Sequence, residues 1–179
     1  MTATAVNATA DTTATVSRER ADLLETLGTH RGFLRHTVRD LTDEQARLAP
    51  TASELSLGGL IKHVAAVERG WADFIVRGTV AQELTPEKYA EFAADLVLAE
   101  DETLAGVLEA YEEIAAATDE LVRTADLDAD HALPEAPWFE AGERWSNRRA
   151  LTHILAETAQ HAGHADIIRE TIDGQKTMG

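Results

Sequence analysis

A helical hydrophobic period recurs in four long stretches of this chain and limits the folds open to it. Apolar residues three and four positions apart mark one face of an amphipathic α-helix. Ser56 and Gly78 stand where a helix cap and a helix stop are favoured, and so do Ser146 and Gly174. Helices of this length predict an all-α four-helix bundle. The predicted helices cover residues 17–41, 57–77, about 100–124 and 147–172.

The segments between these helices are predicted to hold little regular structure. Short helices are expected over 43–48 and 87–93, where Thr-x-x-Gln and Thr-Pro give helix-start signals. The segment 126–143 contains two prolines and the pair Trp138–Phe139, and it is interpreted as a long ordered loop or crossover. No strand is predicted. Long links of this kind permit crossovers, so a simple up-down-up-down order is not required.

Composition excludes several classes of function. Asp and Glu number 32 against 16 Lys and Arg, and the resulting net charge of −16 disfavours binding to nucleic acids and to anionic membranes. The absence of cysteine excludes disulfides and a Cys nucleophile. The Ala/Thr-rich residues 1–16 lack signal-peptide features and are expected to be a disordered tail before one domain, 17–179. A cytoplasmic location is the default expectation.

The last predicted helix carries a stripe of titratable residues. His153, Glu157 and His161 are spaced by four residues and His164 follows by three, which places all four on one face. Glu157 and His161 have the i, i+4 spacing that lets two side chains grip one ion. A carboxylate with an imidazole suits Zn²⁺, Ni²⁺, Mn²⁺ or Fe²⁺.

The alternative for this stripe is a solvated helix face that binds no ion. Two observations favour a metal. Apolar residues flank the stripe at both ends, and polar groups in an apolar face must be paired or ligated. His63 lies within the apolar face of the second long helix, where it is either a hydrogen-bonded core histidine or a third ligand opposite Glu157 and His161.

Two segments resemble the DinB-like (YfiT-like) metalloenzyme superfamily: LSLGGLIKHVAAVERGW around His63, and HILAETAQHAGHADIIRETIDG in the last helix. The resemblance covers nearly the whole chain after the tail. It implies a four-helix bundle of up-down-down-up order with the metal between the second and fourth helices. The superfamily typically has His-x-x-x-His there, followed by Arg-Gly-Gln, whereas this sequence has Glu157, His161 and then Ala-Gly-His.

The mycothiol-dependent branch of the superfamily, which includes maleylpyruvate isomerases, is similar in this departure because it uses a His, Glu, His zinc set. The resemblance therefore implies His63, Glu157 and His161 as ligands, with zinc the first choice of metal. His164 and His153 are expected to support the ligands or face the substrate, or else to be plain helix surface. No catalytic residue is assigned.

The resemblance also implies chemistry. Three protein ligands leave a coordination position open, as in catalytic sites, and related proteins transfer low-molecular-weight thiols such as mycothiol. The leading hypothesis is a metal-dependent thiol S-transferase with a small-molecule thiol and an electrophile as partners. The alternatives are a metal-dependent hydrolase and a non-catalytic, stress-associated metal-binding bundle. A homodimer is expected because superfamily members often pair their bundles.

Overall fold

The computed structural model describes residues 16–79 and 85–177, and within them the four long helices and the two short ones are present. The predicted tail, residues 1–16, lies outside the described residues except for Val16, so the domain boundary stays a prediction. The elements are α1 Arg18–His36, α2 Asp43–Ala46, α3 Leu57–Arg77, α4 Pro86–Ala94, α5 Leu104–Thr124, β1 Asp130–Ala132, β2 Arg144–Ser146 and α6 Asn147–Asp173.

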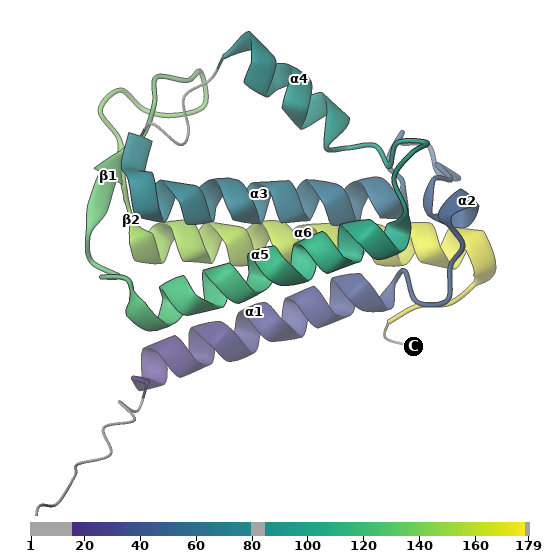
Figure 1. Ribbon diagram of the computed structural model, residues 1–179, viewed down its shortest axis with the longest axis horizontal. Helices are drawn as coiled ribbons and strands as arrows, with labels where there is room; N and C mark the ends of the chain where they lie inside the picture. The colour runs from purple at the N-terminus through teal and green to yellow at the C-terminus, as the bar shows by residue number, and fades with distance from the viewer. Residues whose placement is uncertain (1–15, 80–84, 178–179) are drawn as a thin grey trace, which may run out of the picture.

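The long helices form the all-α bundle that the sequence predicts. Helix α3 packs against α5 and α6, and α1 packs against α6 and α5. Figure 1 shows that α3 and α5 run in the same direction, opposite to α1 and α6, so the order is up-down-down-up. The crossover that this order needs is the connection through α4. Among the described residues, none of the helices combines the length and the apolarity that a membrane span requires.

The helix ends bear out the sequence signals for α3 and α6. The Ser56 hydroxyl accepts a hydrogen bond from the Gly59 N–H at 3.2 Å, and the Ser146 hydroxyl accepts one from the Arg149 N–H at 3.2 Å. Gly174 ends α6 in the left-handed conformation with φ of 81°. These caps fix where the two helices begin, and hence which of their residues face each other.

Two predicted helix boundaries were wrong by four to five residues. Helix α1 ends at His36 rather than at residue 41, and Asp40 adopts a positive φ of 62°, which no helix accommodates. Arg169 of α6 donates to the carbonyl oxygens of Thr37 and Arg39 at 2.8 and 2.7 Å, which holds this turn. Helix α5 starts at Leu104 rather than near residue 100, because the hydroxyl before it, on residue 103, caps the helix.

The prediction of no strands was also wrong. Within 126–143 and the residues after it, β1 and β2 form an antiparallel ladder in which His131 pairs with Trp145. The Leu133 N–H then donates to the Glu143 carbonyl at 2.9 Å and closes the loop between the strands. Each strand has three residues, too few for an alternation of period two to show in a sequence. The segment is therefore a hairpin with a long tip rather than a crossover.

The core consists of two apolar clusters separated by a polar layer. One cluster lies around the start of α3 and the end of α6, and the other around the end of α3 and the start of α6. Between them lie buried polar residues, one from each long helix: Arg31, Glu68, Thr118 and Thr158. Thr158, which belongs to this layer, directly follows the predicted ligand Glu157. The middle of α6 therefore contributes both to the buried polar layer and to the predicted ligand set.

Candidate metal centre

Helices α3 and α6 bring the three residues of the predicted ligand set together. His63 lies on α3, and Glu157 and His161 lie one turn apart on α6. One ligand atom from each residue lies within 4.8 Å of the others, a grouping that could hold a metal ion. The antiparallel packing of α3 on α6 creates this proximity, because 94 residues of sequence separate His63 from Glu157.

The distances agree with a site for one small divalent ion. His161 Nε2 lies 3.5 Å from Glu157 Oε2, and the rings of His63 and His161 have centroids 4.9 Å apart at 83°. Ligand atoms held tetrahedrally at about 2.0–2.1 Å from zinc are about 3.4 Å apart. The α6 pair already has this separation, and His63 needs only a small adjustment to complete three ligands.

The electrostatics of the group also fit a metal, which needs neutral imidazoles and an ionised carboxylate. Burial lowers the pKa of His63, and the neighbouring His161 lowers it further. The hydrogen bond from His161, followed by the charges of the surrounding histidines, lowers the pKa of Glu157 despite its partial burial. At neutral pH Glu157 is therefore ionised and His63 is uncharged.

The other two histidines of the stripe contact the ligands. His164 Nδ1 lies 3.3 Å from His161 Nδ1, so one of these two nitrogens donates to the other while His161 Nε2 faces Glu157. His153 Nε2 lies 3.6 Å from Glu157 Oε1. Such contacts orient metal ligands in other proteins. Both residues are half-buried.

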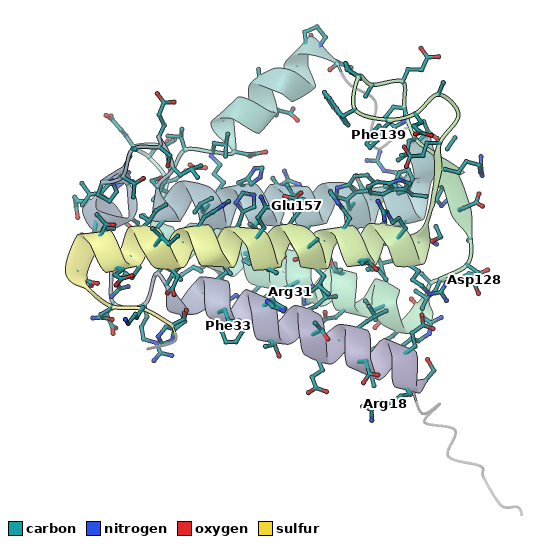
Figure 2. All side chains as sticks on the ribbon, turned by 180° about the vertical axis from the view of Figure 1, so that it is seen from behind. Arg18, Arg31, Phe33, Asp128, Phe139 and Glu157 are labelled. Carbon is teal, nitrogen blue, oxygen red and sulfur yellow. The ribbon has the colours of Figure 1, made fainter. Side chains whose placement is uncertain are left out.

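An aromatic pocket of about 280 Å³ opens beside the ligand group. Its walls come from α3, from α6 and from the tip of the β1–β2 hairpin. Figure 2 shows Phe139 of the hairpin tip and Glu157 on the same side of α6, with Arg31 on the other side. The residues that line the pocket include His63, Val67, Trp71, Pro134, Trp138, Phe139, His153 and Glu157.

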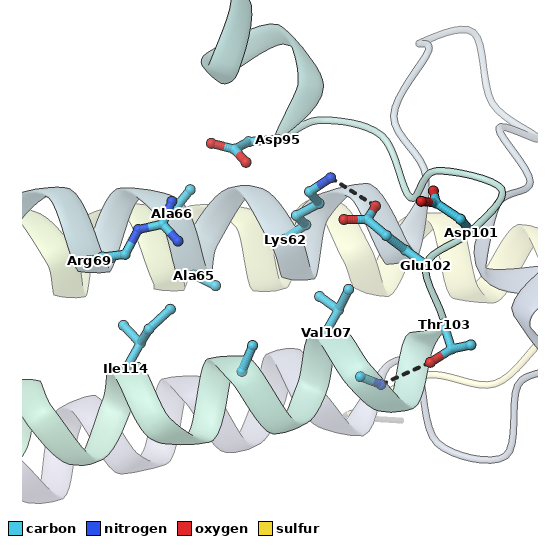
Figure 3. A pocket seen from close by; sticks show the side chains of 12 residues that line it. Lys62, Ala65, Ala66, Arg69, Asp95, Asp101, Glu102, Thr103, Val107 and Ile114 are labelled. Carbon is cyan, nitrogen blue, oxygen red and sulfur yellow. Dashed lines mark hydrogen bonds and ion pairs between the residues drawn. The ribbon is translucent and has the colours of Figure 1, made fainter. Parts of the chain in front are cut away.

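A larger hollow, about 410 Å³, lies between α3 and α5 and contains none of the predicted ligands (Figure 3). Its charged groups include Arg69 and Asp95, and Lys62 donates to Glu102 at 2.8 Å across it. Ala66 lines both this hollow and the aromatic pocket. His63 and Glu157 of the ligand group line the smaller, aromatic pocket instead.

The sequence did not reveal the aromatic pocket. Trp71 was interpreted only as part of a helix face, and Trp138 and Phe139 only as loop residues. The signal that was available is the composition of the loop, because an adjacent Trp and Phe are unusual in a Pro- and Glu-rich segment that should be solvated. The His131 ring of the hairpin packs half-buried against Phe74, with ring centroids 5.4 Å apart.

The sequence matches the family described as mycothiol-S-transferase over residues 22–174. The chain belongs to this family. The match confirms the resemblance to the mycothiol-dependent branch of the DinB-like proteins. It covers α3, α5 and α6 completely and α1 from residue 22 onward. It supports a metal-dependent function related to mycothiol for this member of the mycothiol-S-transferase family.

The fold has a solved counterpart. A conserved protein from Enterococcus faecalis superposes with a TM-score of 0.67 at 16% identity, covering 89% of this chain and 99% of the other. At this identity the likeness shows the fold alone. A search of curated proteins finds no significant match.

Proposed function

We propose that this protein is a metal-dependent transferase that joins a low-molecular-weight thiol of the mycothiol type to an electrophile. The observation that carries the proposal is the position of the His63, Glu157 and His161 group. Two members of the group, His63 and Glu157, line a pocket in a chain of the mycothiol-S-transferase family. Three ligands leave a position open for a reactant, and the pocket is where that reactant would enter.

The chain itself has no thiol, so the sulfur must come from a cosubstrate. A divalent ion held by the three residues would lower the pKa of a thiol bound to it and keep it as thiolate. Two neutral imidazoles and one carboxylate leave one positive charge on such a site, whereas three imidazoles leave two. The lower charge withdraws less electron density, which favours a nucleophilic thiolate over acidification of water.

The protein residues have separate tasks in this proposal. His63, Glu157 and His161 hold the ion. His164 fixes the ring of His161 through the Nδ1–Nδ1 contact, and His153 restrains the Glu157 carboxylate at Oε1. These contacts keep the ligand atoms in place before the ion binds, which lowers the entropic cost of forming the site.

Three further parts of the proposal rest on chemistry and on the family resemblance. Zinc is the proposed metal because its tetrahedral coordination takes nitrogen and oxygen ligands. The cytoplasm is the proposed location because thiols stay reduced there. A homodimer is proposed because superfamily members often pair their bundles. Static light scattering at high micromolar concentration tests the dimer, and a monomer mass would exclude it.

Glu157→Gln tests the mechanism because it nearly keeps the shape of the side chain but removes its charge. We expect metal affinity to fall about tenfold or more and most mycothiol-dependent turnover of monobromobimane to be lost. Glu170→Gln, on the exposed face of the same helix, is the matched control and should behave as wild type. Glu157→His should keep metal and shift the pH profile of turnover. Wild-type affinity and activity in Glu157→Gln would show that Glu157 is only a surface acid.

The same assay separates the two alternative functions. Turnover that needs metal and mycothiol supports transfer. Turnover of ester substrates that needs metal but no thiol indicates a hydrolase. If neither reaction occurs and chelation lowers the melting temperature strongly, the metal has a structural role.

A further inference from the structure

The pocket beside the metal-ligand group is walled largely by apolar and aromatic side chains. Trp71, Trp138 and Phe139 line it together with Pro134 and Val67. Its ionisable lining groups are the imidazoles of His63 and His153 and the carboxylate of Glu157. A polyhydroxylated thiol would lose its hydrogen bonds to water there and find few replacements. The pocket therefore suits the electrophile of the proposed reaction rather than the carrier part of the thiol.

The rings around the pocket are already packed against one another. Trp71 stacks on Trp145 at 4.6 Å and 16°, and the His153 ring contacts both of them edge-on at 5.0 and 5.1 Å. Phe139 packs on Trp145 at 5.8 Å and edge-on to Trp138 at 6.2 Å. Because these contacts fix the walls, a planar ring can enter without a large rearrangement and make stacked or edge-to-face contacts.

The hairpin supplies one of these walls, Trp138, and also Trp145, which stacks behind the wall residue Trp71. Trp145 is in β2, paired with His131, and its indole N–H donates to the Glu143 carboxylate at 2.7 Å. Trp138 comes from the tip and is 60% exposed. A large apolar ring exposed at the mouth of an aromatic pocket gains contacts when an apolar ligand covers it. Trp138 is thus the lining residue most free to respond to a ligand.

Charge narrows the class of electrophile further. None of the residues that line the pocket is Lys or Arg, whereas Glu157 brings a negative charge. Arg149 lies over the Trp145 ring at 4.7 Å and is not one of the residues that line the pocket. An anionic electrophile would lose hydration and gain no counter-charge from the lining residues. The volume of about 280 Å³ accommodates one substituted ring rather than a drug-sized molecule.

We propose that this pocket binds the electrophile of the transfer reaction and selects uncharged, single-ring aromatic compounds, with Trp138 as a specificity-determining residue. The part of this inference that concerns the reaction rests on the proposed transferase function. The part that concerns binding does not, because the pocket walls alone should support binding.

Binding is measured first, on protein from which metal has been removed by chelation. The three tryptophans of the chain all lie at this pocket or stacked behind it, so their fluorescence reports on it. Dinitroaniline, an uncharged ring that cannot react, should quench the emission in a saturable titration after correction for its absorbance. Trp138→Ala should weaken this binding about fivefold to tenfold. Phe33→Ala, an exposed aromatic on α1, is the matched control and should leave it unchanged.

Turnover is measured next, with mycothiol and zinc, on three electrophiles that differ in shape and charge: chlorodinitrobenzene, its carboxylated analogue chlorodinitrobenzoate, and iodoacetamide. With chlorodinitrobenzene a C–S bond forms, the C–Cl bond breaks, chloride leaves with the bonding pair and the thiol proton passes to the buffer. After division by the uncatalysed rate, kcat/KM should be highest for chlorodinitrobenzene. Trp138→Ala should lower it about tenfold through KM for that compound, and little for iodoacetamide.

The outcomes separate this inference from the proposed function. If dinitroaniline binds and Trp138→Ala weakens it while no compound is turned over, the pocket assignment stands and the transferase proposal fails. If all three electrophiles are turned over equally and Trp138→Ala changes neither binding nor selectivity, the transferase proposal stands and this inference is overturned. A higher corrected kcat/KM for chlorodinitrobenzoate than for chlorodinitrobenzene would also overturn it.

Discussion

The middle of the bundle holds two clusters of charged side chains that differ in how completely they are paired. Glu68 is fully buried, and Arg31 donates to both of its carboxylate oxygens at 3.1 and 2.5 Å while also reaching Asp119 at 2.8 Å. Among the residues that the structure describes, the ion-pair partners of Glu157 are histidine nitrogens at 3.5 and 3.6 Å, and its side chain is 26% exposed. The first carboxylate is saturated, whereas the second keeps capacity for a further positive partner.

This difference indicates which cluster serves the fold and which serves a ligand. A buried charge with all its hydrogen bonds made cannot take a new partner without losing one. The Glu157 group faces a pocket, has near neighbours at metal-ligand spacing and lacks a full set of bonds. Glu68 lies in the middle of α3 and Glu157 in the middle of α6. Burial and pairing, rather than residue type, therefore separate the two glutamates.

The largest expected effect comes from breaking the saturated cluster. Glu68→Leu leaves the Arg31 charge buried without its main partner, and we expect the free energy of unfolding to fall by about 3–5 kcal/mol. Urea denaturation followed by circular dichroism measures it. The double variant Arg31→Met with Glu68→Leu should recover most of the loss, since no unpaired buried charge remains. A single-variant loss below about 1 kcal/mol would show that the buried pair behaves like a surface pair.

The next largest effect is expected in the second cluster, the group around Glu157. His161→Ala should reduce metal affinity by about a hundredfold or more, because partners that only orient ligands already contribute about 10–100-fold. The metal-free variant should unfold at nearly the same urea concentration as metal-free wild type, since packing of the apolar helix faces supplies most of the bundle stability. Elemental analysis of untagged protein measures the metal. His36→Ala, an exposed histidine on α1, is the control, and full retention in His161→Ala would exclude His161 as a ligand.

The smallest effect is expected at a third pair, which is only partly buried. The hydrogen bond from Lys62 lowers the pKa of Glu102. The pair therefore stabilises the fold above the ordinary pKa of a glutamate, and this contribution is lost as pH falls through the lowered value. Glu102→Gln should cost less than about 1 kcal/mol at neutral pH, and thermal denaturation should show the difference from wild type shrinking in acid. A difference that grows in acid would contradict this sign.

Local signals in the sequence predicted much of the fold. Ser56 and Ser146 were identified because a capping hydroxyl acts within three residues of the helix it starts. The last residue of α1 was not predicted correctly, because Arg169 holds the turn after α1 from 132 residues away. The first residue of α5 was not predicted correctly either, because several polar residues before it could have capped the helix. The strands β1 and β2 were missed because three residues are too few to show an alternation of apolar and polar side chains.

The candidate site was predictable only where its residues lie close together in the sequence. Glu157 and His161 share one helix, so their spacing alone places them together, whereas joining them to His63 needed the bundle. The aromatic pocket combines Trp71, Trp138 and His153 from three separate segments, and no local pattern brings such residues together. Glu68 stands among the apolar residues of α3 and was not recognised as buried, since its partner Arg31 lies on another helix.

The position of α6 has a consequence for when the site forms during synthesis. This last helix supplies two of the three proposed ligands and packs on both α1 and α3. While the ribosome is still adding residues beyond 147, the nascent chain can carry His63 on a formed α3 but has nothing opposite it. The proposed metal site can therefore form only after α6 has been synthesised and has packed on α3. A truncated product that lacks α6 would leave the ribosome without two of the three proposed ligands.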